Sequence, residues 1–256
     1  MDRTTSADGT TIAYEKDGDG PAIVFVTGAF NDHHRLAPLA AALRDDFTVV
    51  VYDRRGRGES GDGPSYAIER EIEDLAAVID AAGGRASVFG YSSGAMLSLR
   101  AATEVTVDHL FLFEAPFAAP GRPRPAGLAA RMQDLVDDGR PGDAVALFQA
   151  EGIGLPPHVI EQIKQSPMWP GLVAMAQATV YDATITTELA QPTAEMAAVT
   201  VPTLVMVGAE TMPVLREAAK LIPVGDFVEV AGGVDHDVPV EETARLIRER
   251  LSVNNP

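Results

Sequence analysis

Residues 86–102 of the chain read ASVFGYSSGAMLSLRAA, and this stretch decides the fold. It begins as a short apolar strand and continues from Ser93 to Ala102 in a helical pattern, so a tight turn at Ser92 must join the two. A serine in such a turn is pushed into an unusual backbone conformation that holds its hydroxyl above the sheet. Side chains two residues to either side would collide with the turn, and Gly90 and Gly94 occupy both places. The pattern predicts that Ser92 is a nucleophile.

Outward from this turn, apolar strand patterns alternate with helical patterns. Ile68, Ile72, Leu75 and Ile79 recur at spacings of four, three and four residues, which places them on one face of a helix. The alternation predicts an α/β fold with a parallel sheet covered by helices on both sides. The expected strands are 11–15, 22–26, 47–52, 86–89, 109–113, 203–207 and 227–230, and further helices are expected at 35–43 and 243–251.

Between residues 115 and 200 the strand patterns disappear. This stretch opens with four prolines and continues as helical segments. We predict a helical cap (115–200) inserted into a core domain formed by 1–114 and 201–256, covering the strand ends where open α/β sheets bind ligands. Its large apolar residues indicate an apolar substrate, although such residues more often form the cap's own core; they are Met132, Phe148, Met168, Trp169, Met175 and Tyr181.

The composition of the chain limits the classes of partner and chemistry that it can have. The net charge is −17, from 20 basic and 37 acidic residues, which argues against nucleic-acid partners and against an anionic membrane surface. A neutral or cationic small molecule is the better expectation. The absence of cysteine excludes disulfides, thiolate catalysis and cysteine-ligated zinc. With no signal pattern at the start and no apolar run long enough for a bilayer, we expect a soluble cytoplasmic protein.

A serine nucleophile needs two donors for the oxyanion and a base for its proton. The backbone N–H of Ser93 is one expected donor, and the loop 28–32, after the strand 22–26, supplies the other. Ala29 is the first choice there and Phe30 the second. The same loop is also a helix entry, with Asp32 as its N-cap.

His236 is the expected base, because it lies between the last strand and the last helix, at the same edge of the sheet as Ser92. The other histidines fit less well. His109 begins a strand, His158 lies in the cap, and His33 and His34 are expected at the surface.

These motifs resemble the α/β-hydrolase superfamily. Residues 52–60 (YDRRGRGES) are similar to its D-x-R-G-x-G-x-S loop, and residues 202–208 (PTLVMVG) to its penultimate strand. Gly232, Gly233 and His236 are similar to its histidine loop. The resemblance implies an α/β-hydrolase fold with a mostly parallel eight-stranded sheet whose first strands are antiparallel, and it implies no cofactor and no metal. One departure is Thr27, which stands where members commonly carry histidine before the oxyanion-loop glycine.

The acid that would orient His236 also has a different position in this chain from the one usual in the superfamily. Members usually place an acid shortly after the penultimate strand, where this chain has Thr211, with Glu210 one residue early. Some relatives carry the acid directly after the strand that follows the elbow helix. Glu114 stands there, and a carboxylate at the end of an apolar strand needs a partner such as a histidine N–H. We favour Glu114 and keep Glu210 as the alternative.

The sequence therefore predicts a serine esterase-type hydrolase acting on a small ester, lactone or related acyl compound. Ser92 would form an acyl-enzyme, His236 would act as base and then acid, and Glu114 would orient the imidazole. One alternative uses the same triad for carbon–carbon cleavage, cyclisation or cofactor-free perhydrolysis. Another is a non-catalytic ligand-binding protein on a hydrolase scaffold.

Overall fold

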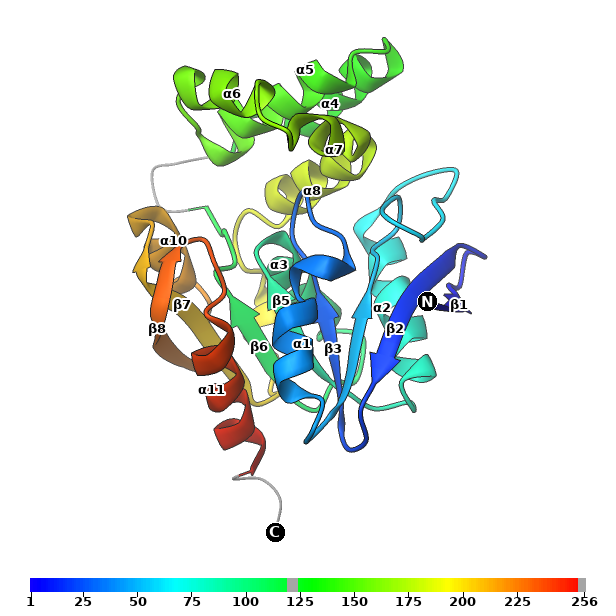
Figure 1. Ribbon diagram of the computed structural model, residues 1–256, viewed down its shortest axis with the longest axis vertical. Helices are drawn as coiled ribbons and strands as arrows, with labels where there is room; N and C mark the ends of the chain where they lie inside the picture. Colours follow the sequence, from blue (N-terminus) through cyan, green and yellow to red (C-terminus); the bar gives the residue numbers. More distant parts are fainter. Residues whose placement is uncertain (119–123, 253–256) are drawn as a thin grey trace.

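The computed structural model of the protein describes residues 1–118 and 124–252. Its centre is an eight-stranded sheet in the order β1-β2-β4-β3-β5-β6-β7-β8 (Figure 1). The pairs β1–β2 and β2–β4 are antiparallel and the remaining pairs are parallel, which confirms the expected sheet. The strands are β1 (Asp2–Thr5), β2 (Thr11–Asp17), β3 (Ala22–Val26), β4 (Thr48–Tyr52), β5 (Ser87–Tyr91), β6 (Leu110–Phe113), β7 (Thr203–Thr211) and β8 (Asp226–Asp235).

Helices cover both faces of this sheet, so the central strands β3, β5 and β6 are buried throughout. Helices α1 (Ala37–Leu43) and α11 (Val240–Ser252) pack on one face. Helices α2 (Ile68–Ala81), α3 (Ser93–Ala101) and α10 (Pro213–Ala219) pack on the other. The apolar face predicted for α2 is the buried one, because its isoleucines and Leu75 all contribute to that core. Burial on both faces explains why the central strands are continuously apolar.

The chain between β6 and β7 forms helices only, within the described residues. Most of them gather at one end of the sheet (Figure 1), and several enclose a third apolar core of their own, whereas Met196 near the end of the insertion packs in the core shared by α2, α3 and α10. No helix in the described ranges combines the length and the apolar character needed to cross a lipid bilayer. The inserted helices are α4 (Leu128–Asp137), α5 (Pro141–Leu147), α6 (Pro157–Lys164), α7 (Trp169–Ala174), α8 (Ala176–Glu188) and α9 (Ala194–Ala197), with a π-helical turn at Phe148–Ile153. The division into two domains at 114/115 and 200/201 stays a prediction.

Several element bounds differ from the sequence expectation: β1 was not among the expected strands, β7 runs on to Thr211, and α11 begins at Val240. Two further differences lie next to the site. Helix α1 begins at Ala37 rather than Arg35, because a separate 3₁₀ turn, His33–Arg35, precedes it; the Asp32 side chain caps that turn as expected. Strand β8 continues to Asp235, through residues 231–235, where a loop was expected. The glycines there permit close pairing, since a Cβ on Gly233 would lie 2.5 Å from Gly208 Cα. His236 therefore follows directly after a strand.

Candidate active site

Ser92 forms the turn between β5 and α3 with φ 57° and ψ −126°, a conformation that non-glycine residues rarely adopt. The two flanking glycines are required by close approaches. A Cβ on Gly90 would lie 2.6 Å from Ala95 Cα, and one on Gly94 would lie 2.4 Å from Val26 O. Both distances are far shorter than a real carbon contact. The local pattern in the sequence therefore produces the strained turn that it predicts.

The loop after β3 runs directly past the serine. A Cβ on Gly28 would lie 2.6 Å from Ser92 Cβ and 3.2 Å from Ser92 Oγ, so only glycine fits at this crossing. Ala29 and Phe30 follow and, together with Ser93, line the same cavity as Ser92. Ser93 is the first residue of α3, so its N–H has no acceptor within the helix. The structure thus brings the expected oxyanion residues together around the serine.

Two buried arginines brace this loop by donating to its backbone carbonyl groups. Arg57 Nη1 donates to Gly28 O over 2.6 Å and to Asn31 O over 3.2 Å. Arg54 Nη1 donates to Thr27 O over 3.1 Å. Both arginines belong to the 52–60 motif, whose role the sequence analysis left undefined.

Asp53, the first acidic residue of the 52–60 motif, explains why the surface position expected for His33 is wrong. His33 was expected at the surface but is buried, since its Nδ1 lies 2.8 Å from Asp53 Oδ1 and its backbone N–H donates to the same oxygen over 2.9 Å. The Asp53 carboxylate is fully buried and needs these donors. Asp53 thereby holds the loop after β3 against the loop after β4.

Asp182 on α8 is a site residue that the sequence analysis missed. Its buried carboxylate accepts from Arg54 Nη1 over 2.9 Å, from Arg57 Nη2 over 2.7 Å and from Ser93 Oγ over 2.7 Å. Burial acts to raise the pKa of Asp182, but the charges of Arg57 and Arg54 outweigh it, so the pKa lies below its ordinary value. Helix α8 is thus hydrogen-bonded both to the two arginines that hold the loop after β3 and to Ser93 at the start of α3. The sequence feature that could have indicated Asp182 is its position as a single aspartate within an apolar helical stretch, VYDATI (180–185).

Glu114 and His236 meet although 122 positions separate them in sequence. His236 Nδ1 lies 2.5 Å from Glu114 Oε2, and Glu114 Oε1 accepts from the Gly208 N–H over 2.8 Å. The carboxylate is buried, and the residue has φ 50°, which turns it inward after β6. Glu210, the alternative acid, lies exposed on β7. The acid next to the histidine is therefore Glu114.

The histidine is held from two further sides. The Tyr91 ring stacks on the imidazole with centroids 4.8 Å apart, and Tyr91 Oη donates to His236 O over 2.7 Å. Arg35 Nη2 donates to Asp237 Oδ1 over 2.6 Å and lies over the Tyr91 ring. Burial raises the pKa of Tyr91, so the phenol remains a hydrogen-bond donor. Neither Tyr91 nor Arg35 was predicted from the sequence as a site residue.

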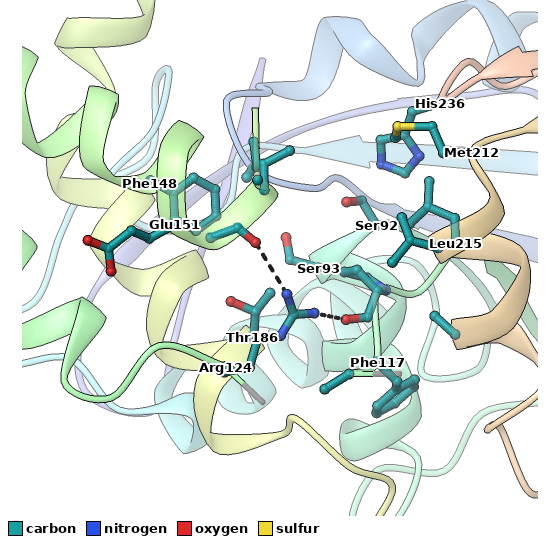
Figure 2. Close-up of a pocket in the computed structure, with 18 of the residues that line it drawn as sticks. Ser92, Ser93, Phe117, Arg124, Phe148, Glu151, Thr186, Met212, Leu215 and His236 are labelled. Carbon is teal, nitrogen blue, oxygen red and sulfur yellow. Dashed lines mark hydrogen bonds between the residues drawn. The ribbon is translucent and has the colours of Figure 1, made fainter. Parts of the chain in front are cut away.

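Ser92 and His236 face one cavity of about 410 Å³ (Figure 2). Its walls are largely apolar, with Phe117, Phe148 and Leu215 among the lining residues. Within the described residues no hydrogen bond joins Ser92 Oγ to the imidazole, which is common before a substrate is bound. Of the apolar residues noted in the sequence between 115 and 200, only Phe148 lines the cavity; Met132 and Tyr181 belong to the third core, and Met168 is 63% exposed.

One group of described side chains has the composition of a metal site. Asp32, His33 and His34 bring one potential ligand atom each within 4.8 Å of one another. These atoms already have partners, because His33 Nδ1 contacts Asp53 and His34 Nδ1 lies 3.1 Å from Asp32 Oδ1. Their hydrogen bonds explain the cluster as part of the loop structure, and we assign it no metal role.

Comparison with known proteins gives matches over nearly the whole chain. The sequence model of the α/β hydrolase family matches residues 23–249. The structure is similar to an α/β hydrolase from Sphaerobacter thermophilus, with 44% identity, a TM-score of 0.89, and coverage of 98% of this chain and 100% of that one. It is also similar to a thermophilic esterase from Thermogutta terrifontis, with 25% identity, a TM-score of 0.68 and 99% coverage of each chain.

A curated relative matches over a shorter region. It is 3-oxoadipate enol-lactonase 1 from Acinetobacter baylyi, 33% identical over 98 residues. The match covers 37% of this chain, and the chain spans 37% of the length of the lactonase.

Proposed function

Because the chain belongs to the α/β hydrolase family, we propose that it is a serine hydrolase that cleaves a small ester, lactone or related acyl compound. The observation that carries the proposal is the contact of the buried Glu114 carboxylate with His236, 2.5 Å apart, where His236 shares a cavity with the strained Ser92. An imidazole oriented by a carboxylate is the base that a serine of ordinary pKa needs. The enol-lactonase and esterase among the similar proteins support an acyl substrate.

In the proposed mechanism, Ser92 Oγ attacks the carbonyl carbon while His236 Nε2 takes its proton. The negative charge that forms on the carbonyl oxygen is held by the N–H groups of Ala29 and Ser93. His236 then returns the proton to the departing alcohol oxygen, which leaves an acyl group on Ser92. Water, deprotonated by His236, attacks the acyl carbon; the bond to Ser92 Oγ then breaks, the acid is released, and His236 returns the proton to Ser92 Oγ. Glu114 remains ionised and stabilises the imidazolium formed in each half of the reaction.

We also propose that the inserted helices form a cap that covers the acyl group of the substrate. They contribute Phe148 and Thr186 to the cavity wall, and Phe117, which follows β6 and packs against the core on one face of the sheet, lines it as well (Figure 2). Such a cover excludes water from the reacting carbonyl and favours a mainly apolar acyl chain.

Covalent labelling tests the nucleophile. A fluorophosphonate should add to Ser92 in a one-to-one ratio, detected by peptide mass spectrometry, and should abolish hydrolysis of short p-nitrophenyl esters. Ser92→Ala should lose both reactions, whereas Ser65→Ala, at an exposed serine, should keep both. Ester hydrolysis by protein whose Ser92 stays unlabelled would exclude this mechanism. Labelling without ester turnover would instead favour carbon–carbon cleavage or another reaction of the same triad.

A further inference from the structure

Arg124 places a positive charge in the wall of the proposed active-site cavity. Its guanidinium donates to Gly152 O over 3.2 Å and to Pro116 O, and so lies between the end of the β6 segment and the π-helical turn of the insertion (Figure 2). Both acceptors are neutral carbonyl groups. They fix the position of the guanidinium without balancing its charge.

No carboxylate balances this charge within the described part of the chain. The buried Nε–H of Arg124 has no hydrogen-bond partner there. Glu151 lines the same cavity but binds Arg131 outside it, over 3.0 Å from Nη1 to Oε1, and Figure 2 shows its carboxylate directed away from Arg124. Residues 119–123, which the structure does not describe, contain neither Asp nor Glu.

The fully buried arginines Arg54 and Arg55 differ from the part-buried Arg124. Arg54 has Glu71 and Asp182 as partners, and Arg55 has Asp8 and Asp74. Burial without such a partner lowers the pKa of the Arg124 guanidinium from its ordinary value, which reflects the cost of desolvating a charge. An arginine kept in a ligand cavity at this cost is best explained by an anion that binds there.

We propose that Arg124 binds a carboxylate carried by the acyl substrate, so that the substrate is an ester or lactone of a dicarboxylic acid. This inference rests on the proposed hydrolase function. The free N–H groups of the guanidinium suit the two oxygens of a carboxylate. Phe117 and Leu215 line the same cavity and suit the hydrocarbon chain between the carboxylate and the scissile carbonyl. The local cation also lets an anion enter a protein whose net charge is −17.

Matched ester pairs test the inference. Monomethyl succinate, glutarate and adipate are compared with methyl butanoate, pentanoate and hexanoate, which replace the carboxylate by a methyl group. Methanol release, followed by proton NMR, gives kcat/KM for each ester. The native protein should prefer the acid at one chain length. Arg124→Gln should lower kcat/KM for that acid about 10- to 100-fold and change the neutral ester less than about threefold, the range expected for a charged hydrogen bond.

Two further variants separate charge from structure. Arg124→Lys keeps the positive charge and should restore part of the preference for the acid. Arg140→Gln removes a charge from an exposed pair with Asp143 on the same insertion and should leave the preference unchanged. Equal losses for acid and neutral esters in Arg124→Gln, or no preference for any acid in the native protein, would overturn the inference.

Calorimetry on Ser92→Ala separates this inference from the proposed function. Acid esters that bind this variant, and bind it at least 10-fold more weakly when Arg124→Gln is added, support the carboxylate site even if Ser92 proves not to be a nucleophile. Conversely, the protein could hydrolyse neutral esters with Ser92 as the residue that the fluorophosphonate labels, while Arg124→Gln has no selective effect on acid esters. That result would support the hydrolase proposal and exclude the carboxylate site.

Discussion

At the scale of single residues, the unusual feature is a glutamate that ends a buried strand. Glu114 follows the apolar β6 and turns inward with positive φ, where its two oxygens meet one backbone N–H and one imidazole nitrogen. A carboxylate this deeply buried needs hydrogen-bond partners, and each of its two oxygens has one. In the proposed mechanism this group holds the His236 ring in the tautomer whose Nε2 faces the substrate.

Glu114→Gln should therefore lower kcat about 100- to 10,000-fold, because a neutral amide neither stabilises the imidazolium nor selects the tautomer. Steady-state ester hydrolysis measures the effect, and circular dichroism checks that the variant is folded. The matched change Glu210→Gln, on an exposed residue of β7, should alter kcat less than about twofold. A larger loss in Glu210→Gln than in Glu114→Gln would exclude Glu114 as the triad acid.

At the scale of elements, the site depends on how closely β5, α3 and the loop after β3 approach one another. The turn at Ser92 is possible because Gly90 lies against Ala95 and Gly94 lies against the end of β3. Gly28 then passes within van der Waals distance of the serine itself. These contacts leave no space for a methyl group, so packing between the elements maintains the strained serine conformation.

Gly90→Ala should open this turn, because its Cβ would lie 2.6 Å from both Ala95 Cα and Ser98 Oγ. We expect a loss of about 1–3 kcal/mol in the free energy of unfolding, the usual range for overpacking, together with lower kcat. Urea unfolding measures the first quantity. Gly171→Ala in α7 is the matched control, since nothing lies within 4 Å of the added methyl group. A stability of Gly90→Ala equal to that of Gly171→Ala would contradict the packing argument.

At the scale of the whole molecule, Asp182 links the insertion to the sheet. Its carboxylate on α8 binds two arginines from the loop after β4 and the first serine of α3. Those arginines in turn hold the carbonyls of the loop after β3. The inserted helices and the oxyanion region are therefore joined through one buried charge, and a change in either is expected to affect the other.

Asp182→Asn should lower the free energy of unfolding by about 3 kcal/mol, because it leaves two buried arginines short of a negative partner. Since the pKa of Asp182 is lowered in the folded protein, its stabilisation is fully present above its ordinary pKa of 3.8 and is lost as pH falls through the folded pKa. The stability difference between native and variant protein should accordingly be constant above about pH 5 and shrink below pH 4.

Urea unfolding at several pH values measures this difference. Asp143→Asn, in an exposed pair with Arg140, should change stability by less than about 1 kcal/mol at every pH. An Asp182→Asn effect that persists unchanged well below pH 3 would show that packing, and not the carboxylate charge, accounts for the loss.

Much of this protein could be predicted from short stretches of its sequence. The strand–helix alternation, the parallel part of the sheet and the turn at Ser92 follow from hydrophobic periodicity and glycine placement, which act over a few residues, whereas the antiparallel first strands were implied by the resemblance to the α/β-hydrolase superfamily. Errors arose where contacts between distant segments decided the outcome. His33 is buried because Asp53 binds it, and β8 runs on to Asp235 because its glycines let it pair closely with β7.

Local sequence was enough to place a serine at the end of a central strand, because steric exclusion around a tight turn acts over a few residues. Long-range packing, by contrast, sets which acid meets His236, which groups brace the oxyanion loop and where the unbalanced charge of Arg124 lies. Each depends on contacts of charged side chains with groups, charged or polar, that come from other segments of the chain. Such contacts emerge only when the sheet and the insertion are packed, since electrostatic energy follows separation in space and not position in sequence.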